Sequence, residues 1–106
     1  MLHYFPPSID AHIREAIAGK HLLQLRYKNQ TRVVEPHDYG VQHGVQRLLV
    51  YQLNSTGTTG SHSVGWRLFD VAKIESLSVL EAKFKGSRRA GSQDHHTWDA
   101  LYARVE

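Results

Sequence analysis

The strongest constraint on the fold of this chain is a series of short strand-like runs separated by turn-forming residues, the first of which alternates apolar and polar residues. In residues 23–28 every second residue is apolar, which is typical of a strand with one face in a core. Asn29 and Gln30 form a predicted turn into residues 31–37, so a β-hairpin is expected. Pro36 has no amide proton and therefore favours an edge or the end of this second strand.

Three further strands are predicted downstream. Residues 47–53 are too apolar for a strand with one face in water, so we expect them in the centre of a sheet. Residues 54–65 are rich in Ser, Thr and Gly and lack periodicity, which indicates an exposed loop. Residues 66–71 and 74–80 then read as two strands with a tight connection between them, giving about five strands in all.

Helices are predicted at both ends of this β region. Ser8 is a suitable N-cap for a short amphipathic helix that ends near Gly19. A basic, Gly- and Ser-containing linker occupies residues 85–94, and helical spacing of apolar residues predicts a final helix over residues 95–104. The residues that define these helix faces are Ile9, Ile13, Ala16 and Ile17, and Trp98, Leu101, Tyr102 and Val105. We therefore expect one α+β domain over residues 1–106, with a small, closed or nearly closed five-stranded antiparallel barrel over residues 20–82.

Composition narrows the function classes. The 106 residues suffice for one modest core, and the absence of cysteine excludes disulfides, thiol nucleophiles and thiolate metal sites. No long apolar segment or signal-peptide pattern is present, so we expect a cytoplasmic protein with no membrane contact. The formal net charge of +3 is compatible with a phosphate-bearing partner but does not require one.

The order of several short motifs resembles the WYL domain of bacterial transcriptional regulators. The strongest piece is Arg-Val-Val-Glu-Pro-His at residues 32–37, and the likeness extends from about residue 9 to residue 84. Its other pieces are the helix residues 13–17, residues 25–27, residues 47–51, residues 67–69, and the pair Lys73-Ile74. Arg47 and Leu48 replace the Trp and Tyr of the family's signature, whereas Leu49 is retained.

This resemblance implies an Sm-like barrel that senses or binds a ligand, often single-stranded nucleic acid or a nucleotide, for a DNA-binding partner protein. Arg32, Arg67 and Lys73 fall on the family's basic positions, and Arg26 lies on the first predicted strand. If the fold brings these side chains together, they form a groove that neutralises phosphates or another anionic small molecule. The alternative is a solvated face with ion pairs to acidic residues such as Glu35, Asp38 and Asp70.

Aromatic residues and His37 complete the predicted ligand site. Tyr27 or Trp66 can stack on a base, although alternation favours core packing for Tyr27 and Phe69. His37, beside Pro36, is expected to form a hydrogen bond at the end of its strand. In the linker, Arg88 and Arg89 are either an arm over a bound strand or residues that keep the segment soluble.

Catalysis and metal binding find little support in the sequence. Glu35 and Asp38 lack a marked nucleophile beside them, and His37, His43 and the pair His95–His96 do not match a metal-ligand pattern. We therefore expect no enzyme activity, no metal and no cofactor. The competing function class is a protein-interaction or homo-oligomerisation module, formed by the barrel edge or the last helix, in which the basic residues only aid solubility.

Overall fold

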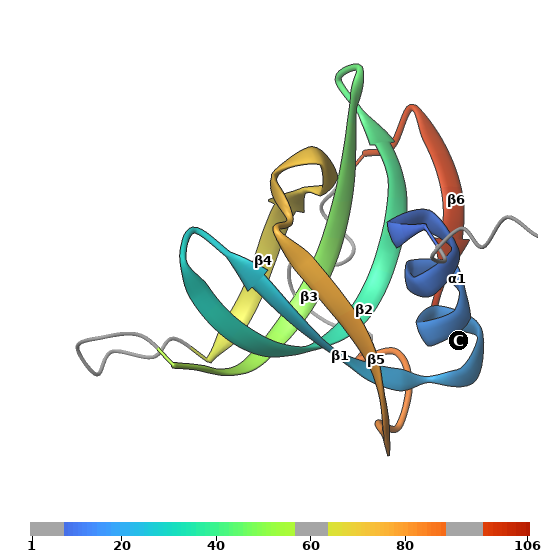
Figure 1. Ribbon diagram of the computed structural model, residues 1–106. Helices are drawn as coiled ribbons and strands as arrows, with labels where there is room; N and C mark the ends of the chain where they lie inside the picture. Colours follow the sequence, from blue (N-terminus) through green and yellow to red (C-terminus); the bar gives the residue numbers. More distant parts are fainter. Residues whose placement is uncertain (1–7, 57–63, 89–96) are drawn as a thin grey trace, which may run out of the picture.

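A computed structural model describes residues 8–56, 64–88 and 97–106, which form one helix and a six-stranded antiparallel sheet (Figure 1). In chain order the elements are α1 (Ile9–Gly19), β1 (His21–Tyr27), β2 (Gln30–Gln42), β3 (Val45–Thr56), β4 (Gly65–Asp70), the 3-10 helix η1 (Val71–Lys73), β5 (Ser76–Lys83) and β6 (Ala100–Arg104). The predicted loop tip at 57–63, residues 89–94 of the predicted linker, and the pair His95–His96 lie outside the described residues.

Strand β2 organises the sheet. The strand order is β4-β3-β2-β1-β5, and β6 also pairs with β2. One edge of β2 pairs with β3, while its other edge pairs first with β1, as in Leu25 opposite Arg32, and then with β6, as in Asp38 opposite Arg104. The register between β2 and β3 shifts after Val33 and again after Pro36. These irregularities bend β2 between the part that pairs with β1 and the part that pairs with β6.

The five predicted strands are confirmed, but the predicted closed or nearly closed barrel is corrected to an open, curved sheet (Figure 1). The strand order ends at β4 on one side and β5 on the other, and no pairing joins these two strands in the part of the chain that the structure describes. Alternation predicts strands and their faces, but it carries no information about whether the outer strands meet.

The predicted C-terminal helix is wrong, because residues 100–104 form strand β6. Leu101 pairs with Gly40, and Ala103 pairs with Tyr39. The spacing of Leu101, Tyr102 and Val105 suits a helix face, yet Leu101 is 41% exposed while Val105 is 3% exposed. The backbone groups of β2 beyond its pairing with β1 require partners, and this tertiary demand outweighs the local pattern.

The N-terminal helix is confirmed with the predicted cap. The Ser8 hydroxyl accepts a hydrogen bond from the Ala11 amide at 3.1 Å, and the chain leaves the helix at Lys20 in the left-handed conformation. Helix α1 buries Ile13, Ala16 and Ile17 in the same core as the sheet. The Tyr39 hydroxyl also donates to Asp10 Oδ1 at 2.6 Å, which joins the helix to β2.

The core consists of side chains from α1, the sheet and η1. Its buried members include Leu23, Leu25, Val34, Tyr39, Leu48, Val50, Phe69, Val71, Ile74 and Val105. Five polar side chains are buried as well: Glu35, His37, Asp38, Gln42 and Gln52. Four of the five lie on β2, so the strand that organises the sheet also concentrates its buried polar groups. Within the described ranges, no helix is long and apolar enough to span a membrane.

Substituting Gly40 tests the strand assignment of residues 100–104. A Cβ at Gly40 would overlap the backbone oxygen of Ala100 and lie 3.0 Å from the Leu101 Cα. We expect Gly40→Ala to displace β6 and lower the free energy of unfolding by about 2–4 kcal/mol, measured by urea denaturation. Gln46→Ala, at an exposed position of β3, is the control and should stay within about 0.5 kcal/mol of the parent. A change in Gly40→Ala no larger than that of the control would contradict the β2–β6 pairing.

Candidate anion-binding site

Two of the predicted basic residues, Arg32 and Arg67, project from the same face of the sheet. Arg32 on β2 lies opposite Leu25 on β1, and Arg67 on β4 lies opposite Val50 on β3. Residues paired across antiparallel strands share a face. Leu25 and Val50 are 1% and 0% exposed, so both arginines lie on the face that carries the core, where it meets solvent.

The Arg32 side chain is held in a fixed position. Its Nη1 donates to Gln52 Oε1 at 3.1 Å, and its Nη2 donates to the Tyr27 carbonyl oxygen at 3.3 Å. The guanidinium carbon lies 5.6 Å from the ring centre of Tyr27 and 5.3 Å from that of Phe69. The Nε atom is buried and has no hydrogen-bond partner. The guanidinium is therefore positioned by neutral acceptors and aromatic rings, and its buried Nε donor is unused.

The electrostatic environment of Arg32 disfavours a positive charge. Burial lowers the pKa of Arg32, and the neighbouring charge of Arg67 lowers that pKa further. In the described part of the chain no carboxylate forms an ion pair with Arg32, and Arg67 Nη1 donates to the Trp66 carbonyl oxygen at 2.8 Å. Two cations on one partly buried face favour an anion between them.

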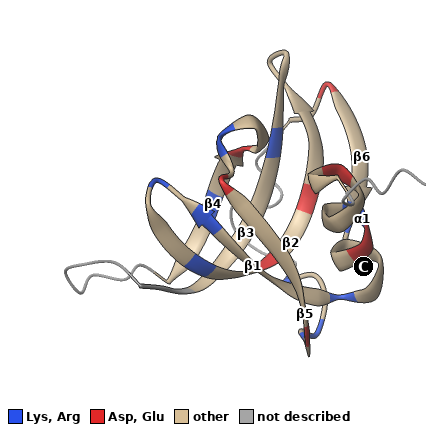
Figure 2. Cartoon of the chain, viewed as in Figure 1, with Lys and Arg blue, Asp and Glu red and all other residues tan. Residues whose placement is uncertain are grey.

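The other two predicted basic residues are engaged elsewhere. Arg26 Nε lies 3.2 Å from Glu75 Oε1. Lys73 Nζ lies 3.5 Å from Asp70 Oδ2, and Arg47 Nε lies 3.1 Å from Asp70 Oδ1. Figure 2 shows the Lys and Arg positions spread over several strands. The structure thus brings together Arg32 and Arg67, while Arg26 and Lys73 form surface ion pairs of the kind that the alternative interpretation anticipated.

The predicted aromatic residues separate to the two faces of the sheet. Tyr27 is only 7% exposed, its ring centre lies 4.4 Å from that of Phe69, and its hydroxyl accepts from the Asp70 amide at 3.2 Å. This matches the core packing that alternation favoured. Trp66 lies opposite Tyr51, which lies opposite Glu35, so these three residues share the other face.

His37 is fully buried next to that second face. Its Nδ1 lies 2.9 Å from the Glu35 carbonyl oxygen, and its ring centre lies 4.8 Å from that of Trp66. The predicted hydrogen bond is observed, but His37 lies in the interior of β2 and not at a strand end, because β2 continues past Pro36 to Gln42. The Nδ1 hydrogen bond to a carbonyl requires a proton on Nδ1, which leaves Nε2 as an acceptor, and Nε2 is buried without a partner. Burial lowers the pKa of His37 despite the nearby carboxylates of Glu35 and Asp38, and the Arg88 charge lowers it further.

The acidic residues on β2 form ion pairs with arginines. Arg88 donates from Nε and Nη2 to the two oxygens of Glu35 at 2.7 and 3.1 Å, and Arg104 does the same to Asp38 at 2.9 and 3.1 Å. Such bidentate pairing fixes the orientation of both carboxylates. Among the residues that the structure places, no group of three or more His, Asp or Glu is arranged to hold a metal ion.

Sequence reasoning gave Arg88 no specific position. In the structure its guanidinium carbon lies 3.7 Å from the ring centre of Tyr51 while it pairs with Glu35. The doublet Arg88–Arg89 in the linker was a visible signal, but only the fold shows that Arg88 returns to the β2–β3 face.

Comparisons with known proteins support the fold. No protein-family model matches this sequence, and no curated protein matches it. A solved structure of the proteasome accessory factor B/C of Arthrobacter aurescens is similar, with a TM-score of 0.61 and 21% sequence identity. The match covers 79% of this chain and 13% of that chain, so the present chain corresponds to a small part of that protein.

This likeness is one of fold, and it supports the WYL-like fold that the sequence motifs imply. The two positions that depart from the family signature have clear structural roles here. Leu48 is fully buried in the core, and Arg47 is half-buried, pairs with Asp70, and donates from Nη1 to Gln42 Oε1 at 3.2 Å.

The buried imidazole of His37 predicts a pH dependence of stability. Because its folded pKa is below the unfolded value of about 6.5, the unfolded chain binds more protons between these two values. The stability that neutral His37 contributes is fully present above pH about 6.5. It is lost as the pH falls from there toward the lower pKa of His37 in the folded state. We expect urea denaturation of His37→Gln to show a shallower loss of unfolding free energy below pH about 6.5. His43→Asn, on an exposed turn, is the matched control, and equal slopes in the parent and His37→Gln would contradict the assignment.

Proposed function

We propose that this chain is a WYL-like regulatory module that binds an anionic ligand through Arg32 and Arg67. The ligand class is single-stranded nucleic acid, a nucleotide or another anionic small molecule. One observation carries the proposal: Arg32 is a half-buried guanidinium beside a second arginine, with an unsatisfied Nε and no ion pair among the described residues.

The energetic argument concerns compensation of charge. A partly buried cation without a counter-charge is costly, and a second cation beside it adds repulsion. A phosphate or carboxylate between the two guanidinium groups would reverse both effects, since it accepts charge-assisted hydrogen bonds from each. Arg32 is already oriented by Gln52 and the Tyr27 carbonyl, so little side-chain entropy is lost on binding.

The geometry favours recognition of the phosphate over recognition of a base. Tyr27 is packed against Phe69 beneath Arg32, and Trp66 lies on the opposite face of the sheet. Neither ring faces outward beside the two arginines, so we infer a weak preference for base identity. Arg26 and Lys73 are each in an ion pair and are assigned a minor, long-range contribution.

The wider role follows from the WYL resemblance. We infer a non-catalytic sensor that acts in the cytoplasm, without membrane contact, and transmits ligand binding to a DNA-binding partner protein. The likeness to the proteasome accessory factor B/C structure supports this proposal at the level of fold. No catalytic role is assigned to Glu35 or Asp38, since each is held in a bidentate pair with an arginine.

Fluorescence anisotropy of labelled single-stranded DNA and RNA oligomers tests the site. We expect binding that weakens strongly between about 50 and 200 mM salt, because each neutralised phosphate contributes a slope of about −0.7 for single strands. Arg67→Ala should weaken binding by roughly tenfold. Arg32→Lys keeps the positive charge but loses the planar, paired N–H donors of the guanidinium, and should weaken binding by several-fold.

Lys73→Ala is the matched control, because it also removes one positive charge but from an exposed ion pair. Its affinity should remain within about twofold of the parent. Equal losses of affinity in Lys73→Ala and Arg67→Ala would show that binding depends on general charge attraction and not on a specific site. Absence of binding to either oligomer, together with a dimer that persists at high salt, would favour the protein-interaction class instead.

A further inference from the structure

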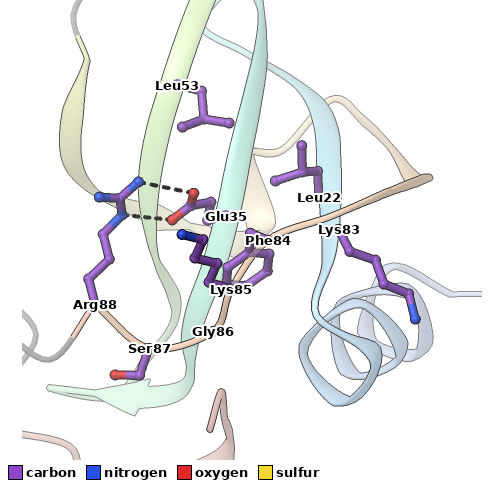
Figure 3. A pocket seen from close by; sticks show the side chains of 9 residues that line it. All are labelled: Leu22, Glu35, Leu53, Lys83, Phe84, Lys85, Gly86, Ser87 and Arg88. Carbon is purple, nitrogen blue, oxygen red and sulfur yellow. Dashed lines mark hydrogen bonds and ion pairs between the residues drawn. The ribbon is translucent and has the colours of Figure 1, made fainter.

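A cavity on the opposite side of the sheet from Arg32 and Arg67 has the features of a second ligand site (Figure 3). Its volume is about 590 Å³, within the usual range for small-molecule pockets. It is lined by Leu22 from β1, Glu35 from β2, Leu53 from β3, Lys83 at the end of β5, and the segment that follows β5: Phe84, Lys85, Gly86, Ser87 and Arg88. Residues from four parts of the chain thus meet at one concave surface.

The outer wall of this cavity is fixed by backbone hydrogen bonds. The Phe84 amide donates to the Lys20 carbonyl oxygen at 2.9 Å, and the Ser87 amide donates to a main-chain oxygen of Glu106 at 3.0 Å. Gly86 has a φ of 110°, and a Cβ there would overlap that same oxygen of Glu106. A glycine is therefore required for the close approach, and the wall is formed before any ligand arrives.

The cavity combines apolar walls with an excess of positive charge. Leu22, Leu53 and Phe84 supply apolar surface. Glu35 is 7% exposed and already accepts two hydrogen bonds from Arg88, so its charge is compensated. Lys85 forms no ion pair or hydrogen bond within the described ranges, and Arg88 uses only Nε and Nη2.

The positions of the two lysines differ. Figure 3 shows the Lys85 side chain running toward Glu35, whereas the Lys83 side chain extends away from the other lining residues. The ammonium of Lys85 and the remaining Nη1 of Arg88 are thus the donors available to a ligand. Both donors carry positive charge and border apolar surface.

We propose that this cavity binds a small apolar carboxylic acid, with the carboxylate at Lys85 and Arg88 and the apolar body against Leu22, Leu53 and Phe84. A planar body suits the site, because the Phe84 ring and the guanidinium that covers Tyr51 both offer flat surfaces. A cationic ligand would meet two like charges, and a purely apolar one would leave both donors unused. The site is separate from the Arg32–Arg67 face, so each can exist without the other.

The test uses 2-naphthoate as the probe, titrated into isotopically labelled protein and followed by amide chemical shifts. We expect saturable shifts in the millimolar range or tighter, confined to the amides of Leu22, Glu35, Leu53 and residues 83–88. The same titration with 2-naphthylmethylammonium should give no saturable shift at these amides. Saturation by the cation to the same degree, or no saturation by 2-naphthoate, would overturn the proposal.

Two matched variants separate the site from general charge attraction. Lys85→Met should weaken 2-naphthoate binding at least fivefold, whereas Lys83→Met, which removes the same charge nearby, should change it by less than twofold. Equal effects of the two variants would overturn the proposal. Arg67→Ala should leave 2-naphthoate binding unchanged, so failure of this site is distinguishable from failure of the nucleic-acid site.

Discussion

The bend in β2 is the constraint on which the rest of the structure depends. One edge of β2 pairs first with β1 and then with β6, while its other edge stays paired with β3 along its whole length. The two register shifts, one after Val33 and one after Pro36, divide the strand into segments that face different partners. Pro36 donates no amide hydrogen bond and lies at the shift, where a missing donor is tolerated. Glu35, His37 and Asp38 lie in buried positions along this part of β2, and the two carboxylates pair with arginines from distant segments.

The strands that could be predicted are those whose side chains alternate in a regular way. β1 has apolar residues at every second position from Leu23 to Tyr27, and turn residues separate it from β2, so local chemistry favours this hairpin. β6 could not be predicted, because Leu101, Tyr102 and Val105 have helical spacing and the strand forms only by pairing with β2. The open edge between β4 and β5 is a property of sheet curvature, which no residue pattern in this sequence encodes.

The candidate site was predictable in part for a related reason. Arg32 and Arg67 stand on the basic positions of the WYL resemblance, and the register places both on one face. Lys73 satisfies the same sequence criterion, and Arg26 lies on the first predicted strand. The fold, however, pairs Lys73 with Asp70 and Arg26 with Glu75. Arg88 lies in a segment without periodicity, so only the tertiary fold shows its contact with Tyr51 and Glu35.

The pairing of β6 with β2 has a consequence for the order in which the chain folds. Asp38 and Arg104 are separated by 66 positions, whereas β1 and β2 are joined by a short turn. Closing a long loop costs more entropy than closing a hairpin, so we expect the meander of β1, β2 and β3 to form before β6 docks. The cavity wall at Gly86 and Ser87 lies against Glu106, two residues after β6, and the Ser87 amide donates a hydrogen bond to it. We therefore expect the cavity beneath that wall to form in the last step of folding, and any species that stalls before this step to leave the edge of β2 at residues 38–41 unpaired.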